Sequence, residues 1–325
     1  MMAEELPKQV VEIAEGIKTM KIRGAGRIAR AAAQALIAAA QSWKGDSLRE
    51  FKSYMRRVAS YLLSTRPTAV SLPNAVNYVI RVLDDRNLAS VEEARRAVVG
   101  KAEEFIERSL KAVETIGEIG SRLIETGMRI LTHCNSNAVE SILIKAWKQG
   151  KRFEVYATET RPRFQGHITA RNLAREGIPV ILIPDAAVYS VMADRKISMV
   201  LVGADTVTAN GAVINKIGTS QIALAAKSLG IRFVVAAETY KFSPYTVVGQ
   251  PVEIEERPWS EVVSEKPTGV EVSNPAFDAT PPDYIDMVIT ELGVIPPKSA
   301  ALLLWEVFGR QPFMKSEVVV EDSEQ

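Results

Sequence analysis

Apolar residues recur at spacings of three and four through roughly the first 125 residues, and no alternating apolar run interrupts them. This periodicity predicts helices over residues 26–43, 47–65 and 71–83, and a longer helix from residue 90 to about residue 125. Pro73 falls in the first turn of the third segment, where a proline is tolerated. We therefore expect a helical N-terminal domain over residues 1–125.

From residue 128 the pattern changes to short apolar runs that are separated by helix-length segments. Strands that alternate with helices predict an α/β domain over residues 126–325, with a parallel sheet covered on both faces. Open sheets of this kind bind ligands beyond the carboxyl ends of their strands, where the strand order reverses. The predicted strands lie in the runs MRILTHC, FEVYATE, PVILIPD, SMVLVGAD and RFVVAAE.

Charge and composition narrow the class of partner. The chain has 40 Lys and Arg residues against 39 Asp and Glu residues, so no bulk positive charge favours nucleic acid. No apolar run reaches the roughly 18 residues that cross a bilayer, and the N-terminus does not resemble a signal peptide, so we expect a cytoplasmic protein without a membrane partner. With 1 cysteine and 2 histidines, neither a disulfide framework nor a structural zinc site is expected.

Cys134 is the first candidate for chemistry, because it ends the run MRILTHC at a strand-to-helix junction. Asn135, Ser136 and Asn137 follow it, and all three are good helix caps. A thiol near a helix N-terminus is biased toward the thiolate, and the free backbone donors there suit a phosphate or a developing oxyanion. The alternative is that Cys134 is only a small buried hydrophobe.

Asp205 occupies the corresponding end of the run SMVLVGAD. A partly desolvated carboxyl group at the end of a central strand could serve as a general acid, whereas the alternative is an aspartate that caps the next turn. Further along, Asn215 and Lys216 precede Gly218 and Thr219 ahead of a predicted helix. This combination offers an amide, a cation and backbone donors to a phosphate.

Three cationic residues outside these segments are also candidates. Arg23 lies beside Gly24 and Gly26 in the segment KIRGAG, and Arg66 precedes a helix-breaking proline. Lys241 follows the fifth predicted strand. Fixed guanidinium groups suit phosphate recognition, although each of these residues could equally be a solvated surface cation.

Several long motifs, in order along nearly the whole chain, resemble the family of methylthioribose-1-phosphate isomerase, ribose-1,5-bisphosphate isomerase and regulatory subunits of the exchange factor for initiation factor two. The resemblance implies a helical domain on a Rossmann-like domain, usually dimerising, with a catalytic cysteine and aspartate in the enzyme members, here Cys134 and Asp205. It is carried by KIRGAG, STRPTAVSLPNA, LTHCNSNAV, ETRPRFQGHITARNLAREGIPVILIPD, VGADTVTANGAVINKIGT, ETYKFSP and NPAFDATPPDYID.

Departures from the family pattern favour one branch. Methylthioribose isomerases typically have the motif RGAPAIG where this chain has RGAGRIA. The segment ETYKFSP resembles the initiation-factor members of the family. The presence of both Cys134 and Asp205 argues against a purely regulatory subunit. The resemblance therefore implies an archaeal isomerase of ribose 1,5-bisphosphate in nucleoside monophosphate degradation, with the methylthioribose isomerase and a non-catalytic regulator as alternatives. It implies no cofactor, AMP as a candidate activator, and a homodimer or a hexamer built from dimers. The implied substrate-binding residues are Arg23, Gly24, Ala25, Gly26 and Arg66 at one end of the sugar and Ser136, Asn137, Asn215, Lys216 and Lys241 around the rest.

Overall fold

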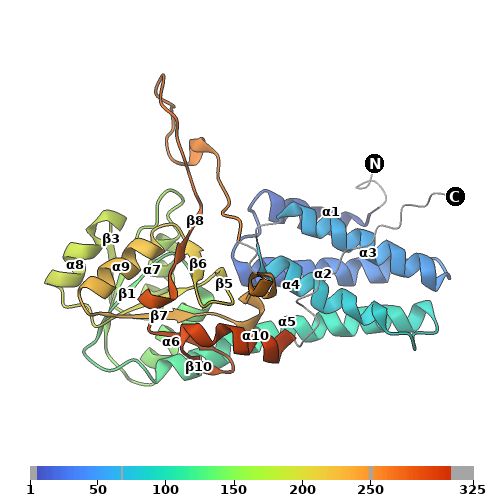
Figure 1. Cartoon of the computed structure of the whole chain (residues 1–325), viewed down its shortest axis with the longest axis horizontal. Coiled ribbons are helices and arrows are strands. Elements are labelled where there is room, and N and C mark those ends of the chain that lie inside the picture. Colours follow the sequence, from blue (N-terminus) through green and yellow to red (C-terminus); the bar gives the residue numbers. More distant parts are fainter. Residues whose placement is uncertain (1–5, 67–68, 249–251, 309–325) are drawn as a thin grey trace.

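The computed structural model describes residues 6–66, 69–248 and 252–308, and Figure 1 shows two regions side by side. One region is a bundle of helices, and the other is a sheet with helices packed on it. Among the described residues, no helix is long and apolar enough to cross a membrane.

The bundle contains the four helices that the periodicity predicts and one that it does not. The unpredicted helix is α1, whose short amphipathic pattern precedes the glycine segment. Helix α3 ends at Thr65, and the third predicted segment finishes as a 3₁₀ turn over Arg81–Asp84. The bounds are α1 Lys8–Lys18, α2 Ala25–Ser42, α3 Leu48–Thr65, α4 Ser71–Ile80 and α5 Val91–Ser121.

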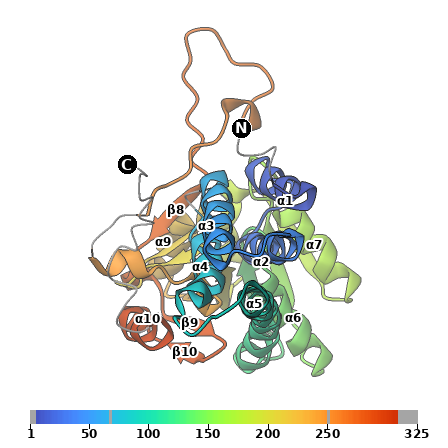
Figure 2. The same cartoon turned by 90° about the vertical axis from the view of Figure 1, so that its right-hand side faces the viewer.

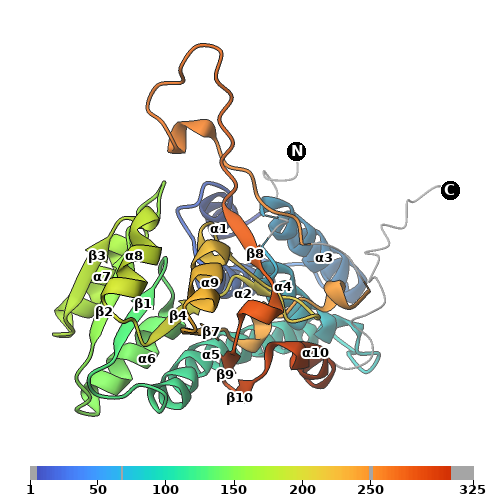
Figure 3. The ribbon, with the colours of Figure 1, turned by 60° about the vertical axis from the view of Figure 1, so that its left-hand side comes forward.

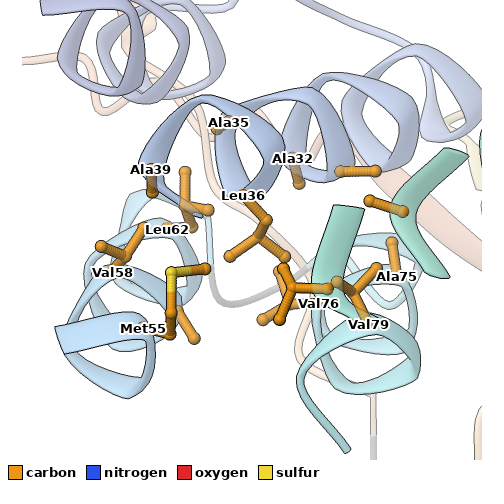
Figure 4. Close-up of a cluster of buried hydrophobic side chains, with 14 of the residues drawn as sticks. Ala32, Ala35, Leu36, Ala39, Met55, Val58, Leu62, Ala75, Val76 and Val79 are labelled. Carbon is orange, nitrogen blue, oxygen red and sulfur yellow. The ribbon is translucent and has the colours of Figure 1, made fainter. Parts of the chain in front are cut away.

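The bundle is held together by an alanine-rich face of α2, against which α3 and α4 pack (Figure 4). Small side chains on α2 allow the neighbouring helices to approach closely, and larger side chains from those helices fill the space. Leu36 and Met55 are both fully buried, and burial of a side chain of this size stabilises the fold by about 1.5–3 kcal/mol. The labelled residues are Ala32, Ala35, Leu36, Ala39, Met55, Val58, Leu62, Ala75, Val76 and Val79.

The five apolar runs form parallel strands, as the sequence predicts. Within the described residues they belong to a seven-stranded sheet with the order β10-β9-β7-β4-β1-β2-β3. Strand β9 continues the parallel pairing beside β7, and β10 pairs antiparallel at the edge. The bounds are β1 Arg129–Thr132, β2 Glu154–Thr158, β3 Val180–Ile183, β4 Met199–Gly203, β7 Arg232–Ala236, β9 Met287–Thr290 and β10 Gly293–Ile295.

Helices cover both faces of this sheet (Figure 3). One face packs against the end of α5 and against α6 (Asn137–Lys148) and α7 (Gly166–Arg175). The other face packs against α8 (Val188–Asp194), α9 (Thr219–Ser228) and α10 (Ala300–Phe308). The fold is therefore a helical region followed by a doubly wound, mostly parallel sheet, and the predicted fold class is confirmed.

Helix α5 joins the two regions. Phe105 packs in the core of the bundle, whereas Ile116, three turns later, packs in the core beneath the sheet. The change from helices to strands falls between Ser121 and Arg129. The division into domains at residue 125 stays a prediction.

A small antiparallel sheet, which the sequence pattern did not predict, lies beside the main one. It has the order β5-β6-β8, with β5 Thr206–Val207, β6 Val213–Lys216 and β8 Phe277–Thr280. Before β8, residues 252–276 form an arm that projects from the molecule (Figure 2), and Arg161 and Arg163 of the body bind it through the Val262 carbonyl and the Glu261 carboxylate. These strands have between two and four residues, too few for a period of two to stand out from the loops around them.

Candidate active site

Cys134 and Asp205 follow neighbouring strands at the point where the strand order reverses. Strand β1 has β2 on one side and β4 on the other, so Cys134 and Asp205 follow the carboxyl ends of adjacent parallel strands. This is the place where open α/β sheets bind their ligands. A cavity of about 160 Å³ lies there. All the residues predicted to form the site line it, namely Arg23, Gly24, Ala25, Gly26, Arg66, Cys134, Ser136, Asn137, Asp205, Asn215, Lys216 and Lys241.

The cavity brings together both regions of the chain. The N-terminal end of α2 and its preceding loop supply Arg23 to Arg27, and the end of α3 supplies Arg66. Met20, between α1 and α2, also contributes, and the remaining residues come from the sheet, its loops and the N-terminal ends of α6 and α7. The site is thus built where the helical bundle meets the carboxyl edge of the sheet.

Two glycines shape the walls of the cavity, Gly24 through its backbone conformation and Gly203 through close packing. Gly24 has a φ of +86°, which disfavours other residues, and it immediately precedes the first turn of α2. Gly203 ends β4, and a Cβ atom there would lie 2.5 Å from Ser136 Oγ. Ser136 is the N-cap of α6, where its hydroxyl accepts a hydrogen bond from Val139 N. The absence of a side chain at Gly203 therefore allows the capped end of α6 to lie against β4.

The expected bias of Cys134 toward the thiolate is wrong, because the surroundings of the thiol favour its protonated form. Burial raises the pKa of the Cys134 thiol to about 11, and the negative charge of Asp205 contributes to the increase. The positive charges of Lys216 and Arg23 and a hydrogen bond from the Asn135 backbone act in the opposite direction but do not outweigh burial. Burial of the thiol therefore outweighs the nearby contacts that favour the thiolate. The thiol is protonated at neutral pH.

Cations outnumber carboxylates around the cavity. Five cationic side chains and two carboxylates line it, so the site favours an anion. Among the described residues, Arg23, Arg27 and Lys216 form no ion pair, and the Lys216 ammonium lies 4.5 Å from the centre of the Phe277 ring. These three cations are available to a ligand.

The other two cations already have acidic partners, which the sequence analysis did not foresee. Arg66 binds one carboxylate oxygen of Glu255 through Nε at 3.1 Å and Nη2 at 2.7 Å. Lys241 Nζ lies 2.6 Å from Glu238 Oε2, and both side chains are buried. Burial opposes ionisation of Glu238, but the Lys241 ammonium holds the pKa of Glu238 below its usual value. Both cations are therefore held in fixed positions at the cavity wall.

The expectation that backbone donors at Gly218 and Thr219 hold a phosphate is wrong. Asp278 accepts hydrogen bonds from Gly218 N at 2.8 Å and from Ser220 N and Oγ, so it already caps α9. Neither Gly218 nor Thr219 lines the cavity. Asn215 does line it, with its amide nitrogen donating to Thr219 Oγ1 at 3.0 Å.

His133 is buried next to Cys134 and has a structural role. Its Nε2 lies 2.9 Å from the Ile217 carbonyl, which can only accept, so Nε2 carries the proton. Its Nδ1 then accepts from Thr158 Oγ1 at 2.6 Å. Burial lowers the pKa of His133 to about 4, so the ring is neutral at physiological pH.

The sequence analysis did not name some of the residues that line the cavity. Arg27 directly follows the glycine segment, and a search for cations beside Gly26 would have found it. Phe277 reaches the site only because β8 pairs with β6, and no local pattern signals that pairing. Among the described residues, no cluster of His, Cys, Asp and Glu could hold a metal ion. The further lining residues are Met20, Arg27, His133, Asn135, Gln165, Ile168, Gly203, Ala204, Glu238 and Phe277.

A larger cavity, of about 910 Å³, lies between α4, α5 and the segment that follows β7. Tyr78, Phe105 and Tyr240 contribute aromatic rings to it. It contains neither Cys134 nor Asp205, and it does not lie at the strand-order reversal. We therefore assign the candidate active site to the smaller cavity.

The fold and the cavity define an open α/β protein with a site in which cations outnumber carboxylates and a thiol lies at a strand end. The model of the Initiation factor 2 subunit family matches residues 21–297, and the chain belongs to this family.

Curated and solved relatives agree with this assignment. Over 311 residues the chain is 51% identical to ribose 1,5-bisphosphate isomerase from Thermococcus kodakarensis, covering 93% of this chain and 95% of the relative. It is 50% identical to the protein of the same name from Archaeoglobus fulgidus, covering 96% and 98%. It is 39% identical to methylthioribose-1-phosphate isomerase from Heliobacterium modesticaldum, covering 88% and 87%.

Among solved structures, translation initiation factor eIF-2B from Pyrococcus horikoshii is 33% identical, with a TM-score of 0.78, covering 90% of this chain and 98% of that one. The resemblance to this family and the expectation of an isomerase are confirmed.

Proposed function

We propose that this chain converts ribose 1,5-bisphosphate to ribulose 1,5-bisphosphate, with Cys134 and Asp205 as the proton-transferring residues. The observation that carries the proposal is the identity of about half of all positions, over nearly the full chain, with relatives of that name. The cavity supports it, because its excess of cations suits a substrate with two phosphates. Following the same resemblance, we place the reaction in nucleoside monophosphate degradation.

The reaction needs a base at C2 of the sugar and an acid at the ring oxygen. The Cys134 thiolate removes the C2 proton, the electron pair forms the C1–C2 double bond, the bond from C1 to the ring oxygen breaks, and Asp205 protonates that oxygen. The resulting enol of the 1-phosphate then accepts a proton at C1 and loses its hydroxyl proton, which gives the ketone at C2. No atom is gained or lost, and the phosphate stays on O1 throughout.

The raised pKa of Cys134 imposes a condition on this mechanism. In the resting protein the thiol holds a proton, whereas the reaction needs a thiolate and a protonated Asp205. Moving one proton from the thiol to the carboxyl group satisfies both requirements. Such an exchange requires no net uptake of protons from the solvent.

The alternative substrate, methylthioribose 1-phosphate, has a thioether where the bisphosphate has its second phosphate. A thioether requires apolar contacts, whereas this cavity presents Arg23, Arg27 and Lys216 without acidic partners in the described chain. A non-catalytic regulator would have no use for both Cys134 and Asp205. Both observations favour the bisphosphate. The oligomeric state and activation by AMP stay predictions.

Steady-state assays of the purified protein with each sugar phosphate test the substrate. We expect kcat/KM for ribose 1,5-bisphosphate to exceed that for methylthioribose 1-phosphate by at least about 100-fold, because a site built for a charged group leaves its cations unpaired when that group is absent. Faster turnover of the methylthio sugar would reject the proposed substrate. No turnover of either sugar would favour the regulator.

A variant at Lys241 tests the choice of substrate further, but its buried partner Glu238 must be replaced at the same time. Replacing Lys241 alone leaves the Glu238 carboxylate buried without a counter-charge, which costs about 3–5 kcal/mol of stability. In the double variant Lys241→Met/Glu238→Gln, KM for the bisphosphate should rise by about 10- to 100-fold, the effect of one charge-assisted hydrogen bond. Lys227→Met, at an exposed position on α9, is the control. An unchanged KM in the double variant would remove Lys241 from the substrate site.

A further inference from the structure

Both peptide groups of Cys134 are bound by buried threonine hydroxyls. The Cys134 backbone N–H donates to Thr160 Oγ1 at 2.9 Å, and Thr169 Oγ1 donates to the Cys134 carbonyl oxygen at 2.9 Å. Thr160 follows β2 and Thr169 lies in α7, and both residues are fully buried. Two elements other than β1 therefore fix the backbone on each side of the thiol.

The conformation of Cys134 requires such support. Its φ is +67°, in the left-handed region that residues with a Cβ atom rarely adopt. A residue in this region persists only where the surrounding structure holds it there. The left-handed turn is also where the chain leaves β1 before α6 begins at Asn137, so it determines where the thiol lies relative to the cavity.

Each threonine hydroxyl is fully used as both donor and acceptor. Thr160 Oγ1 accepts from Cys134 N and donates to the Thr158 carbonyl at 3.3 Å. Thr169 Oγ1 donates to the Cys134 carbonyl and accepts from Asn135 Nδ2 at 2.9 Å. Removal of either hydroxyl would leave a polar group of the Cys134 backbone without its partner in a buried setting.

The position of Thr160 is itself fixed by Asp185, which follows β3. The two oxygens of that carboxylate accept from Thr160 N at 2.8 Å and from Arg161 N at 2.7 Å. Thr160 also has a positive φ, of +62°, which is costly for a β-branched residue. Hydrogen bonds thereby connect the residues that follow β3, β2 and β1, from Asp185 through Thr160 to Cys134.

We propose that Thr160 and Thr169 are positioning residues that hold Cys134 in the left-handed conformation and so place its thiol for proton transfer. The proposal rests on the proposed role of Cys134 as the base. Neither threonine lines the cavity, so both act through Cys134 rather than on the substrate.

Valine and serine variants at each position test the proposal, because valine keeps the shape without the hydroxyl and serine keeps the hydroxyl. We expect Thr160→Val and Thr169→Val to lower kcat by about 100-fold with little change in KM, since a small misplacement of a reacting group has an effect of this size. Thr160→Ser and Thr169→Ser should recover most of kcat. If one valine variant does not fold, the other still tests the proposal, because the two hydroxyls hold opposite sides of Cys134.

Alkylation by iodoacetamide provides a second readout that does not depend on turnover. The chain contains 1 cysteine, so the mass shift on the peptide that carries Cys134 reports this thiol alone. In the parent protein the rate should rise with pH to a midpoint of about 11, and in the valine variants the loosened thiol should be alkylated faster at pH 8, with a lower midpoint. Thr115→Val is the control, because the Thr115 hydroxyl donates to the Lys111 carbonyl within its own helix. It should change neither kcat nor the alkylation rate of Cys134.

The results separate this proposal from the proposed function. Valine variants with a lowered melting temperature but with kcat and the alkylation profile of the parent protein would overturn positioning and leave a purely structural role. Unchanged turnover in Cys134→Ser would instead overturn the role of Cys134 as the base. The alkylation profile would still decide whether the threonines hold the thiol.

Discussion

Replacing Cys134 with serine is expected to lower kcat for ribose 1,5-bisphosphate by about 10²–10⁴-fold, the usual contribution of a positioned proton-transferring group. Serine has nearly the same size, and its hydroxyl can occupy the same place beside Asp205. Its oxygen is a far weaker acid than a thiol, so it cannot form the required base. KM should therefore change much less than kcat, because the cations that line the cavity remain.

The measurement is steady-state turnover of the bisphosphate by the parent protein, Cys134→Ser and Cys134→Ala. Both variants should lose alkylation by iodoacetamide completely, which verifies that the parent signal comes from this residue. Near-parental kcat in either variant would exclude Cys134 as the base, whatever the substrate.

Replacing Asp205 with asparagine is expected to lower kcat by a similar factor of about 10²–10⁴, because an amide cannot deliver a proton to the ring oxygen. The same change removes a negative charge that helps to raise the pKa of Cys134. Cys134 should therefore be alkylated faster in Asp205→Asn than in the parent protein at the same pH. Slower turnover together with a more reactive thiol would not result from general loss of structure at the site.

Asp194→Asn, at an exposed position that ends α8, is the matched control and should keep parental turnover and alkylation. Asp205→Asn with parental kcat would remove Asp205 from the mechanism. Asp205→Asn with low kcat but slower alkylation would indicate that the variant disturbs the cavity rather than the proton transfer.

The sequence pattern predicts those helices and strands whose buried side chains form a long, regular apolar run. These elements are the helices α2 to α5 and the strands β1, β2, β3, β4 and β7. The strands of the small sheet were missed because each is short and mixes apolar with polar residues, and because the pairing of β6 with β8 joins segments more than 60 positions apart. Strand β9 was missed although its sequence, MVIT, is a short apolar run. Helix α1 was missed although the spacing of its apolar residues is regular.

The sequence by itself determined the candidate residues. A thiol and a carboxylate at two strand ends, with glycines and cations elsewhere, follow from apolar runs and from the rule that parallel strands end at one edge. It could not determine their electrostatic state. The helix N-terminus that suggested a thiolate is local, whereas the burial that raises the pKa of Cys134 comes from side chains throughout the chain.

Only the tertiary structure decided which cations are free and how the thiol is held. Arg66 and Glu255 are 189 positions apart, so their ion pair could not be predicted from local spacing. The hydroxyls that fix Cys134 come from Thr160 and Thr169, on elements that pack beside it only after the sheet is assembled. Apolar periodicity determines which segments are buried, but contacts between polar groups depend on which of those segments become neighbours.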